Sequence, residues 1–274
     1  MKRILTIQDI SCLGQCSLTV ALPIISALGV EASVLPTAVL STHTMFKNFT
    51  FADLTEEMPK IEKHWINEGL KFDGFYTGYV GSIKQIEYIS SIMDSCRTSD
   101  AINVVDPCMA DHGKLYPGFA PEFPAEMLKL CKKADVIVPN LTEACLLLGI
   151  EYRTYNKEEL EKIAKDLCII TNASVILTGV SFNEDELGAL VYDNNNQTID
   201  YYFTKKIPAM FHGTGDCFAS SFFGALIKGY SLMDATKVAC EFTALAIEKT
   251  YADKDTHWYG VHFEEALKYL TNLE

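Results

Sequence analysis

The residues best suited to chemistry lie at positions 212–218, which read His-Gly-Thr-Gly-Asp-Cys-Phe. A proline-free run of small and apolar residues from 217 to 227 predicts a helix that this glycine turn enters. Backbone N–H groups and the dipole at a helix start favour anions, so three residues form a candidate phosphate seat: Gly213, Thr214 and Gly215. Asp216 would repel that anion, which makes sense if it takes the proton from a hydroxyl group that attacks the phosphate. Alternatively, Asp216 only caps the helix, a common role for aspartate.

Two sets of acidic residues could bind a divalent cation. Asp106 and Asp111 flank the sequence Pro-Cys-Met-Ala, and Asn140 and Glu143 lie three positions apart at a predicted helix start. Carboxylate and amide oxygens suit Mg²⁺, which usually keeps several of its waters. Both sets also have a structural interpretation, because Asp106 could end a strand in an Asp-Pro turn and Asn140 with Glu143 could form a capping box. An anion seat, a base and acidic residues are together the parts that phosphoryl transfer needs.

The elements that must position these residues alternate along the chain. Short apolar runs predict buried strands, separated mostly by helical patterns, at residues 3–7, 31–35, 74–76, 102–105, 136–138 and 174–177. A hairpin is predicted within residues 187–203, and residues 37–51 are expected to be irregular or a lid. Such alternation is typical of an α/β fold with a mostly parallel sheet that helices cover on both faces. The sequence shows no repeat or linker, so we expect one domain over residues 1–274.

Polar residues or glycine follow five of the predicted strands: Gln8-Asp9, Thr77-Gly78-Tyr79, Asp106, Asn140 and Thr178-Gly179. In open parallel sheets, ligands bind outside the carboxyl ends of the strands. The sequence therefore predicts a ligand site along that edge. A kinase built this way would need its own architecture, because the Walker loop and the protein-kinase motifs are absent from the sequence.

Composition restricts the partners and the compartment. A net charge of −13 argues against binding to nucleic acid or to an anionic membrane, both of which need clustered Lys or Arg. No stretch approaches the ~20 apolar residues of a membrane span, and the apolar run at the N-terminus is too short for a signal peptide. The nine scattered cysteines are typical of free thiols in a reducing compartment, so we expect a cytoplasmic protein.

The motifs, taken together, resemble the ribokinase-like superfamily of small-molecule kinases, whose fold is a three-layer α/β/α sandwich. Four segments carry the resemblance in the family's order: Thr-Gly-Tyr-Val-Gly-Ser at 77–82, Asp-Pro-Cys-Met-Ala-Asp at 106–111, Pro-Asn-Leu-Thr-Glu at 139–143 and Gly-Thr-Gly-Asp at 213–216. The last is similar to the superfamily signature, the middle two to its vitamin-kinase branch, and the first to pyridoxal kinases. Residues 7–8 and 41–44 also look like pyridoxal kinase, and the match covers about residues 4–249.

The resemblance implies ATP-dependent phosphorylation of the 5′-hydroxymethyl group of pyridoxal, pyridoxamine or pyridoxine, with Mg²⁺ as the metal, by a homodimer. Asp216 would be the base, and the Gly-Thr-Gly segment before it would form the anion hole. Three residues would order Mg²⁺: Asp106, Asp111 and Glu143. Three would bind the nucleotide: Asn140, Thr178 and Gly179. Three would face the pyridine ring: Asp9, where many pyridoxal kinases have Ser, Thr44 and Tyr79.

Two other functions remain open. The first is a hydroxymethylpyrimidine kinase of thiamin synthesis, which also phosphorylates a hydroxymethyl group on a six-membered nitrogen heterocycle. Tyr79 in its Gly-Tyr-x-Gly-Ser setting favours the pyridoxal-type enzyme. The second is a non-catalytic protein of this fold that binds a vitamer or a nucleotide, against which the retention of Asp216 argues. A sugar kinase fits poorly, because residues 9–14 lack the glycine pair expected for sugar hydroxyls.

Overall fold

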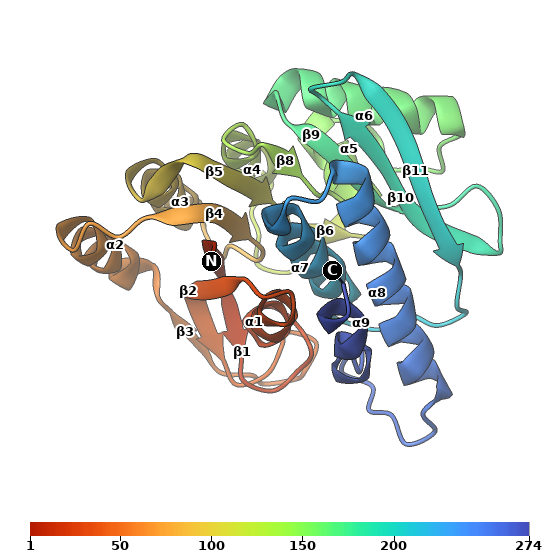
Figure 1. Cartoon of the computed structure of the whole chain (residues 1–274), viewed down its shortest axis with the longest axis horizontal. Helices are drawn as coiled ribbons and strands as arrows, with labels where there is room; N and C mark the ends of the chain where they lie inside the picture. The colour runs from red at the N-terminus through yellow and green to blue at the C-terminus, as the bar shows by residue number, and fades with distance from the viewer. Residues whose placement is uncertain (274) are drawn as a thin grey trace.

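The computed structural model describes residues 1–273, which form a nine-stranded mixed sheet between two layers of helices (Figure 1). Its parallel centre contains β8 (Val136–Ile137), β5 (Arg97–Val105), β4 (Phe72–Thr77), β1 (Arg3–Ser11) and β2 (Glu31–Leu40), in that spatial order. Beyond β2, β3 (Phe51–Asp53) closes one edge in the antiparallel direction. Beyond β8 come the parallel β9 (Ser174–Val180) and the antiparallel hairpin of β10 (Glu186–Asp193) and β11 (Thr198–Lys205).

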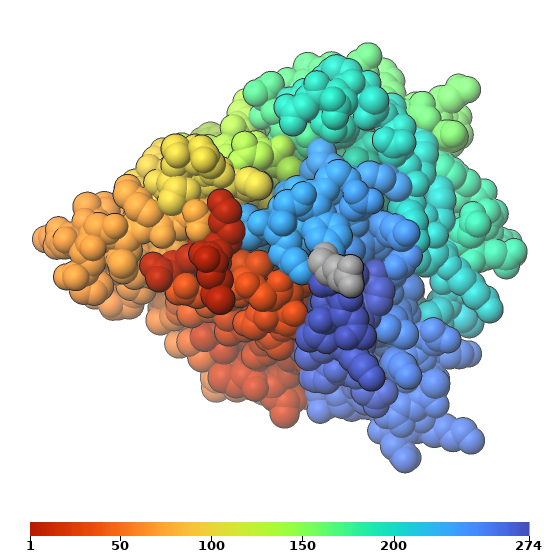
Figure 2. Space-filling view, in the orientation of Figure 1, coloured from red at the N-terminus to blue at the C-terminus, as the bar shows by residue number. Residues whose placement is uncertain are grey.

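Helices cover both faces of the sheet. One layer consists of α1 (Leu18–Ala27), α7 (Thr214–Lys228), α8 (Leu232–Ala252) and α9 (Leu267–Thr271). The other consists of α2 (Met58–Asn67), α3 (Ile83–Ser95), α4 (Phe123–Cys131), α5 (Leu141–Leu148) and α6 (Lys157–Thr171). Figure 2 shows that the first layer brings the N-terminal segment, in red and orange, against the C-terminal helices, in blue.

The strands are apolar on both faces, which explains why their sequences are continuous apolar runs. In β4, Phe75 packs into the core under α2 to α6, and its neighbour Tyr76 packs into the core under α1 and α7 to α9. In β5, Val105 packs into the core under α2 to α6, and Val104 packs into the core under α1 and α7 to α9. This period of two agrees with the predicted α/β fold with a mostly parallel sheet covered on both faces, which is confirmed.

Several predicted boundaries are wrong. β1 and β2 continue together to Ser11 and Leu40 past an irregularity at Gln8, so Gln8 and Asp9 lie inside a strand rather than after one. Thr178 and Gly179 likewise belong to β9, because β10 pairs with this end of the strand. A small hairpin of β6 (Ala110–Asp111) and β7 (Lys114–Leu115) follows β5. Within residues 1–273, no helix has both the length and the apolar character needed to cross a bilayer.

Candidate active site

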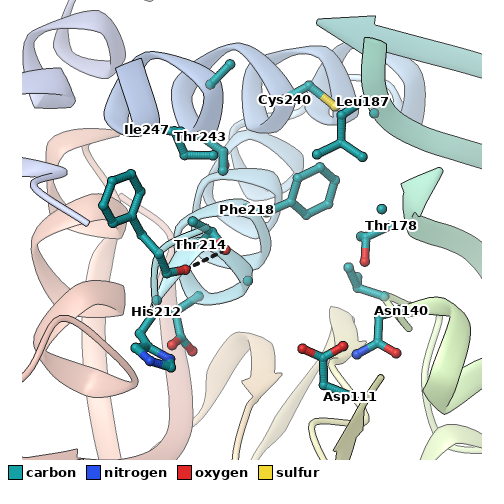
Figure 3. Close-up of a pocket in the computed structure, with 18 of the residues that line it drawn as sticks. Asp111, Asn140, Thr178, Leu187, His212, Thr214, Phe218, Cys240, Thr243 and Ile247 are labelled. Carbon is teal, nitrogen blue, oxygen red and sulfur yellow. Dashed lines mark hydrogen bonds between the residues drawn. The ribbon is translucent and has the colours of Figure 1, made fainter. Parts of the chain in front are cut away.

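A cavity of about 410 Å³ opens at the carboxyl ends of β5, β8 and β9 (Figure 3). The start of α7 and one side of α8 form a second wall, and the end of the β10–β11 hairpin with residues 206–212 forms a third. The predicted catalytic, nucleotide and metal residues all line it: Asp106, Asp111, Asn140, Glu143, Thr178, Gly179, Gly213, Thr214, Gly215 and Asp216. Of the five groups predicted to share one edge of the sheet, those of Asp106, Asn140 and Thr178-Gly179 are confirmed to line one cavity.

The glycine turn begins α7 earlier than predicted, at Thr214 rather than at Cys217. Gly213 precedes the helix with φ 83°, and a Cβ at this position would lie 1.7 Å from the carbonyl oxygen of Gln15. Only glycine fits there, both for its backbone angle and for the space available. At Gly215, by contrast, an added Cβ would meet nothing within 4 Å. The first turn of α7 therefore presents bare backbone to the cavity, as a seat for a phosphate group requires.

Asp216 lies in this same first turn, next to the seat. The residue that caps the helix is Gly213, and no side chain makes a capping hydrogen bond, so the interpretation of Asp216 as the cap is wrong. Burial, with a smaller contribution from the charge of Asp9, raises the pKa of Asp216 to about 7, although a hydrogen bond from the backbone of Ser17 lowers it. A carboxylate with a pKa near neutrality can both accept and release a proton under ordinary conditions.

Asp106 and Glu143 form an acidic pair in the same cavity. Burial, followed by the charges of Glu143 and Asp216, raises the pKa of Asp106 well above its usual value. Burial raises the pKa of Glu143 to about 8, although backbone N–H groups of Asn140, Met109 and Ala110 lower it. Across residues 1–273, no group donates a hydrogen bond to the Asp106 carboxylate. Each of these carboxyl groups therefore holds its proton more tightly than a carboxyl group in water does.

Asn140 and Glu143 also form the capping box of α5, as their structural interpretation predicted. The Asn140 side chain accepts a hydrogen bond from the Glu143 N–H at 3.0 Å, and Glu143 Oε2 accepts one from the Asn140 N–H at 2.9 Å. Glu143 Oε1 accepts from the Met109 N–H at 3.1 Å, and Asn140 Nδ2 donates to the Ala110 carbonyl at 2.9 Å. These two side chains therefore fix the acidic segment containing Asp106 against the start of α5.

The donor set fits a hydrated divalent cation better than a directly caged one. In the described part of the chain, no group of three His, Cys, Asp or Glu side chains is arranged to bind a metal ion. Asp111 lies at the exposed rim and accepts a hydrogen bond from the His112 N–H at 2.7 Å. Mg²⁺ commonly keeps several waters, so Asp106, Glu143 and Asp111 could hold such an ion through those waters.

Sequence reasoning missed the residues at the other end of the cavity. Figure 3 shows Leu187, Phe218, Cys240, Thr243 and Ile247 gathered at the end away from Asp111. Two lysines also line the cavity, Lys205 at the end of β11 and Lys206 beside it. No motif marks these residues, because they come from a strand edge and from the middle of helices. The one available signal was the position of the lysines directly after a predicted hairpin.

The three predicted vitamer-binding residues do not line this cavity. Asp9 is buried and accepts hydrogen bonds from Ser17 Oγ at 2.5 Å and Ser11 Oγ at 3.0 Å. Its charge raises the pKa values of both Asp216 and Tyr79, which places it near each of them. Thr44 is exposed in the irregular segment 41–50. Asp9 and Tyr79 therefore lie near Asp216 but outside the lining of the cavity.

Known proteins are similar to this chain over nearly its whole length. A family model described as phosphomethylpyrimidine kinase matches residues 21–259. A candidate phosphomethylpyrimidine kinase from Bacteroides thetaiotaomicron is 37% identical with a TM-score of 0.95, over 100% of this chain and 95% of its own. An orthorhombic form under the same description was determined with pyridoxal.

Proteins described as pyridoxal kinases are similar as well. The structure of pyridoxal kinase from Lactobacillus plantarum is 33% identical with a TM-score of 0.92, over 98% of this chain and 96% of its own. Pyridoxal kinase of Arabidopsis thaliana is 26% identical over 249 residues, which are 84% of this chain and 74% of the relative. The family model matches residues 21–259, and the Bacteroides structure aligns with the whole chain. The chain therefore belongs to the phosphomethylpyrimidine kinase family.

Proposed function

We propose that this protein is a pyridoxal kinase, which transfers a phosphoryl group from ATP to the 5′-hydroxymethyl group of pyridoxal, pyridoxamine or pyridoxine. The observation that carries the proposal is Asp216, a buried carboxylate with a pKa near 7 in the same helical turn as a bare glycine seat for phosphate. The acceptor class is supported by the similarity to the pyridoxal kinase of L. plantarum and to the Bacteroides protein determined with pyridoxal.

The proposed reaction is an in-line displacement at the γ-phosphorus. Asp216 accepts the proton of the substrate hydroxyl, the freed oxygen bonds to the γ-phosphorus, and the bond from that phosphorus to the β,γ-bridging oxygen breaks. ADP leaves with the bond's electron pair, and Asp216 later returns its proton to solvent. The N–H groups of the first turn of α7 hold the charge that spreads over the phosphate oxygens. Bound Mg²⁺, held through Asp106, Asp111 and Glu143, would neutralise phosphate charge that the acidic cavity would otherwise repel.

On the acceptor side, Asp9, Thr44 and Tyr79 are proposed to hold the pyridine ring. Burial and the charge of Asp9 raise the pKa of Tyr79 to about 12, so its phenol stays neutral and its ring can serve as an aromatic wall. We further propose that the nucleotide contacts Asn140, Thr178 and Gly179, and that the chain acts as a single domain in a cytoplasmic homodimer. These assignments rest on the matching motifs.

The proposal is tested by measuring ATP consumption with Mg²⁺ and, side by side, pyridoxal, pyridoxamine, pyridoxine and hydroxymethylpyrimidine. Phosphorylation of a pyridoxal-type vitamer that EDTA abolishes is expected. The description of the matching family model favours one competitor, a hydroxymethylpyrimidine kinase. A higher kcat/KM for the pyrimidine than for every vitamer would replace the proposal with that function. Nucleotide binding without turnover of any of the four alcohols would favour a non-catalytic role.

A further inference from the structure

The proposed acceptor site is built from segments that lie far apart in the sequence. Tyr79 follows β4, whereas Thr44 lies in the segment 41–50, which connects β2 to β3. Both residues lie outside the strands, so the ladder hydrogen bonds of the sheet do not fix the distance between them. Contacts made outside the site must therefore set that distance.

Gln85 supplies such a contact from the first turn of α3, where it is 1% exposed. Its side-chain oxygen, Oε1, accepts a hydrogen bond from the Gly81 N–H at 2.8 Å. Its side-chain nitrogen, Nε2, donates one to the Thr37 carbonyl at 2.9 Å. Gly81 belongs to the loop that carries Tyr79, and Thr37 lies in β2 shortly before the segment 41–50. One buried amide group therefore joins the loop after β4 to the strand that leads into this segment.

The same amide group also reaches the chain directly after the segment. Gln85 Nε2 lies 2.9 Å from Thr55 Oγ1 and 3.2 Å from Asp53 Oδ1, at the end of β3. Hydrogen bonds from Thr55, together with a weaker contribution from Gln85, lower the pKa of Asp53, so this acceptor is charged at neutral pH. Gln85 therefore holds the chain on both sides of the segment 41–50.

A second hydrogen bond joins β2 to the loop after β4. Thr37 Oγ1 donates to the Tyr79 carbonyl at 3.2 Å, and Val80, the next residue, is fully buried in the core. The backbone of the loop is thus fixed on both sides of Val80, at Tyr79 and at Gly81. Because this backbone is fixed, it determines where the Tyr79 ring begins and which way the ring can point.

We infer that Gln85 is a positioning residue, which sets the spacing between the Tyr79 ring and the segment 41–50 without contacting the substrate. The inference rests on the proposed function and deepens its acceptor side. The role requires an amide, because position 85 must accept from one N–H and donate to oxygen atoms on both sides of the segment. A methionine would fill a similar volume with neither ability, and a charged glutamate would repel Asp53.

The test measures kcat and KM for pyridoxal and for ATP in the wild type, Gln85→Met and Gln85→Glu. We expect both variants to raise the KM for pyridoxal by about ten-fold or more and to leave the KM for ATP within about two-fold, because only the acceptor side loses its anchor. Gln85→Glu should be the more damaging, because it adds the repulsion from Asp53. Thr37→Val is a milder variant that removes only the bond to the Tyr79 carbonyl. It should raise the same KM by about two- to ten-fold.

Asn103→Leu is the matched control. Asn103 is also a buried amide, 2% exposed, and its Nδ2 donates to the Lys133 carbonyl at 2.8 Å, but it does not line the cavity. We expect this variant to lower the melting temperature as Gln85→Met does, and to leave the ratio of the two KM values unchanged. An equal rise of both KM values in Gln85→Met, or the same change of their ratio in Asn103→Leu, would overturn the positioning role.

Amide hydrogen exchange of the free protein separates this inference from the proposed function, because it requires no turnover. Exchange within residues 41–50 and 78–82 should become about ten-fold faster or more in Gln85→Met, while the first turn of α7 keeps its wild-type rate. This result, with no vitamer phosphorylated by the wild type, would leave the anchoring role of Gln85 standing and refute the proposed function. Unchanged exchange in both segments would overturn the inference even if the wild type phosphorylates pyridoxal.

Discussion

At the scale of single residues, Asp216 is a buried carboxyl group that lies in the first turn of α7, next to the proposed anion seat. Its pKa of about 7 comes mainly from burial, so the carboxyl group is partly charged and partly protonated at neutral pH. A base with this pKa removes a proton efficiently and can still release it before the next turnover.

We expect Asp216→Asn to lower kcat by ~10²–10⁴ and to leave ATP affinity within a few-fold, because the amide keeps the shape of the side chain but cannot accept the proton. Steady-state kinetics with pyridoxal, together with a direct nucleotide-binding measurement, would separate the two quantities. Turnover close to that of the wild type would show that the residue has only a structural part in the site.

At the scale of secondary-structure elements, the two glycines at the start of α7 have different tasks. Gly213→Ala should lower the free energy of unfolding and expression, because the methyl group would collide with the Gln15 carbonyl and the backbone angle is unfavourable. Gly215→Ala should leave stability nearly unchanged, because its methyl group would meet no other atom within 4 Å.

The same Gly215→Ala change should raise the KM for ATP or lower kcat by at least about ten-fold, because the methyl group would stand where the phosphate is expected. Thermal unfolding and kinetics of the two variants would be measured in parallel. A Gly215→Ala enzyme with unaltered kinetics would place the phosphate elsewhere in the cavity.

The capping boxes of α5 and α6 offer a matched pair for the metal site. Asn140 with Glu143 and Asn156 with Glu159 make the same reciprocal bonds, but only the first pair lines the cavity. Glu143→Gln and Glu159→Gln should each destabilise the fold by about 0.5–2 kcal/mol, the usual worth of a cap. Only Glu143→Gln should also raise the Mg²⁺ concentration needed for half-maximal activity. An equal metal dependence in both variants would mean that Glu143 is a cap and nothing more.

The sequence predicted features that depend on contiguous residues. It did not predict features that depend on contacts between elements far apart in the chain. Gly213 to Asp216 could be placed correctly at the start of a helix that borders the cavity, because a helix start is a local feature. Thr243 and Lys205 could not be found, because which face of α8 or of β11 borders a cavity depends on elements that lie far away in the sequence. Asp9 was placed after a strand for the same reason, since β1 continues only because β2 pairs with it.

At the scale of the whole molecule, the acidic cavity makes stability depend on pH. The pKa of Asp216 rises on folding from 3.8 to about 7, so the folded protein holds this proton more tightly than the unfolded chain does. The resulting stability is fully present below about pH 4 and is lost as pH rises through about 7. For Asp216 this loss is roughly 4 kcal/mol, because the shift is about three pKa units and each unit corresponds to about 1.4 kcal/mol.

We therefore expect the melting temperature to fall between pH 5 and pH 8, and to fall less in Asp216→Asn, which carries no charge at that position. Calorimetric scans of both proteins across this pH range would test the expectation. Identical slopes in the two proteins would locate the pH dependence outside the site. MgADP should restore more stability at pH 8 than at pH 5, because it balances carboxylates that are charged only at the higher pH.

The first turn of α7 holds both Asp216, the proposed base, and the proposed anion seat. The distance between the two is set by one rigid helical turn and not by the loops around it. The residues proposed to hold the acceptor, in contrast, all precede position 80, in β1, in the segment 41–50 and after β4. Under the proposed assignments, substitutions in the N-terminal third would change which alcohol is accepted, whereas the proposed phosphate-binding turn of α7 would stay unchanged.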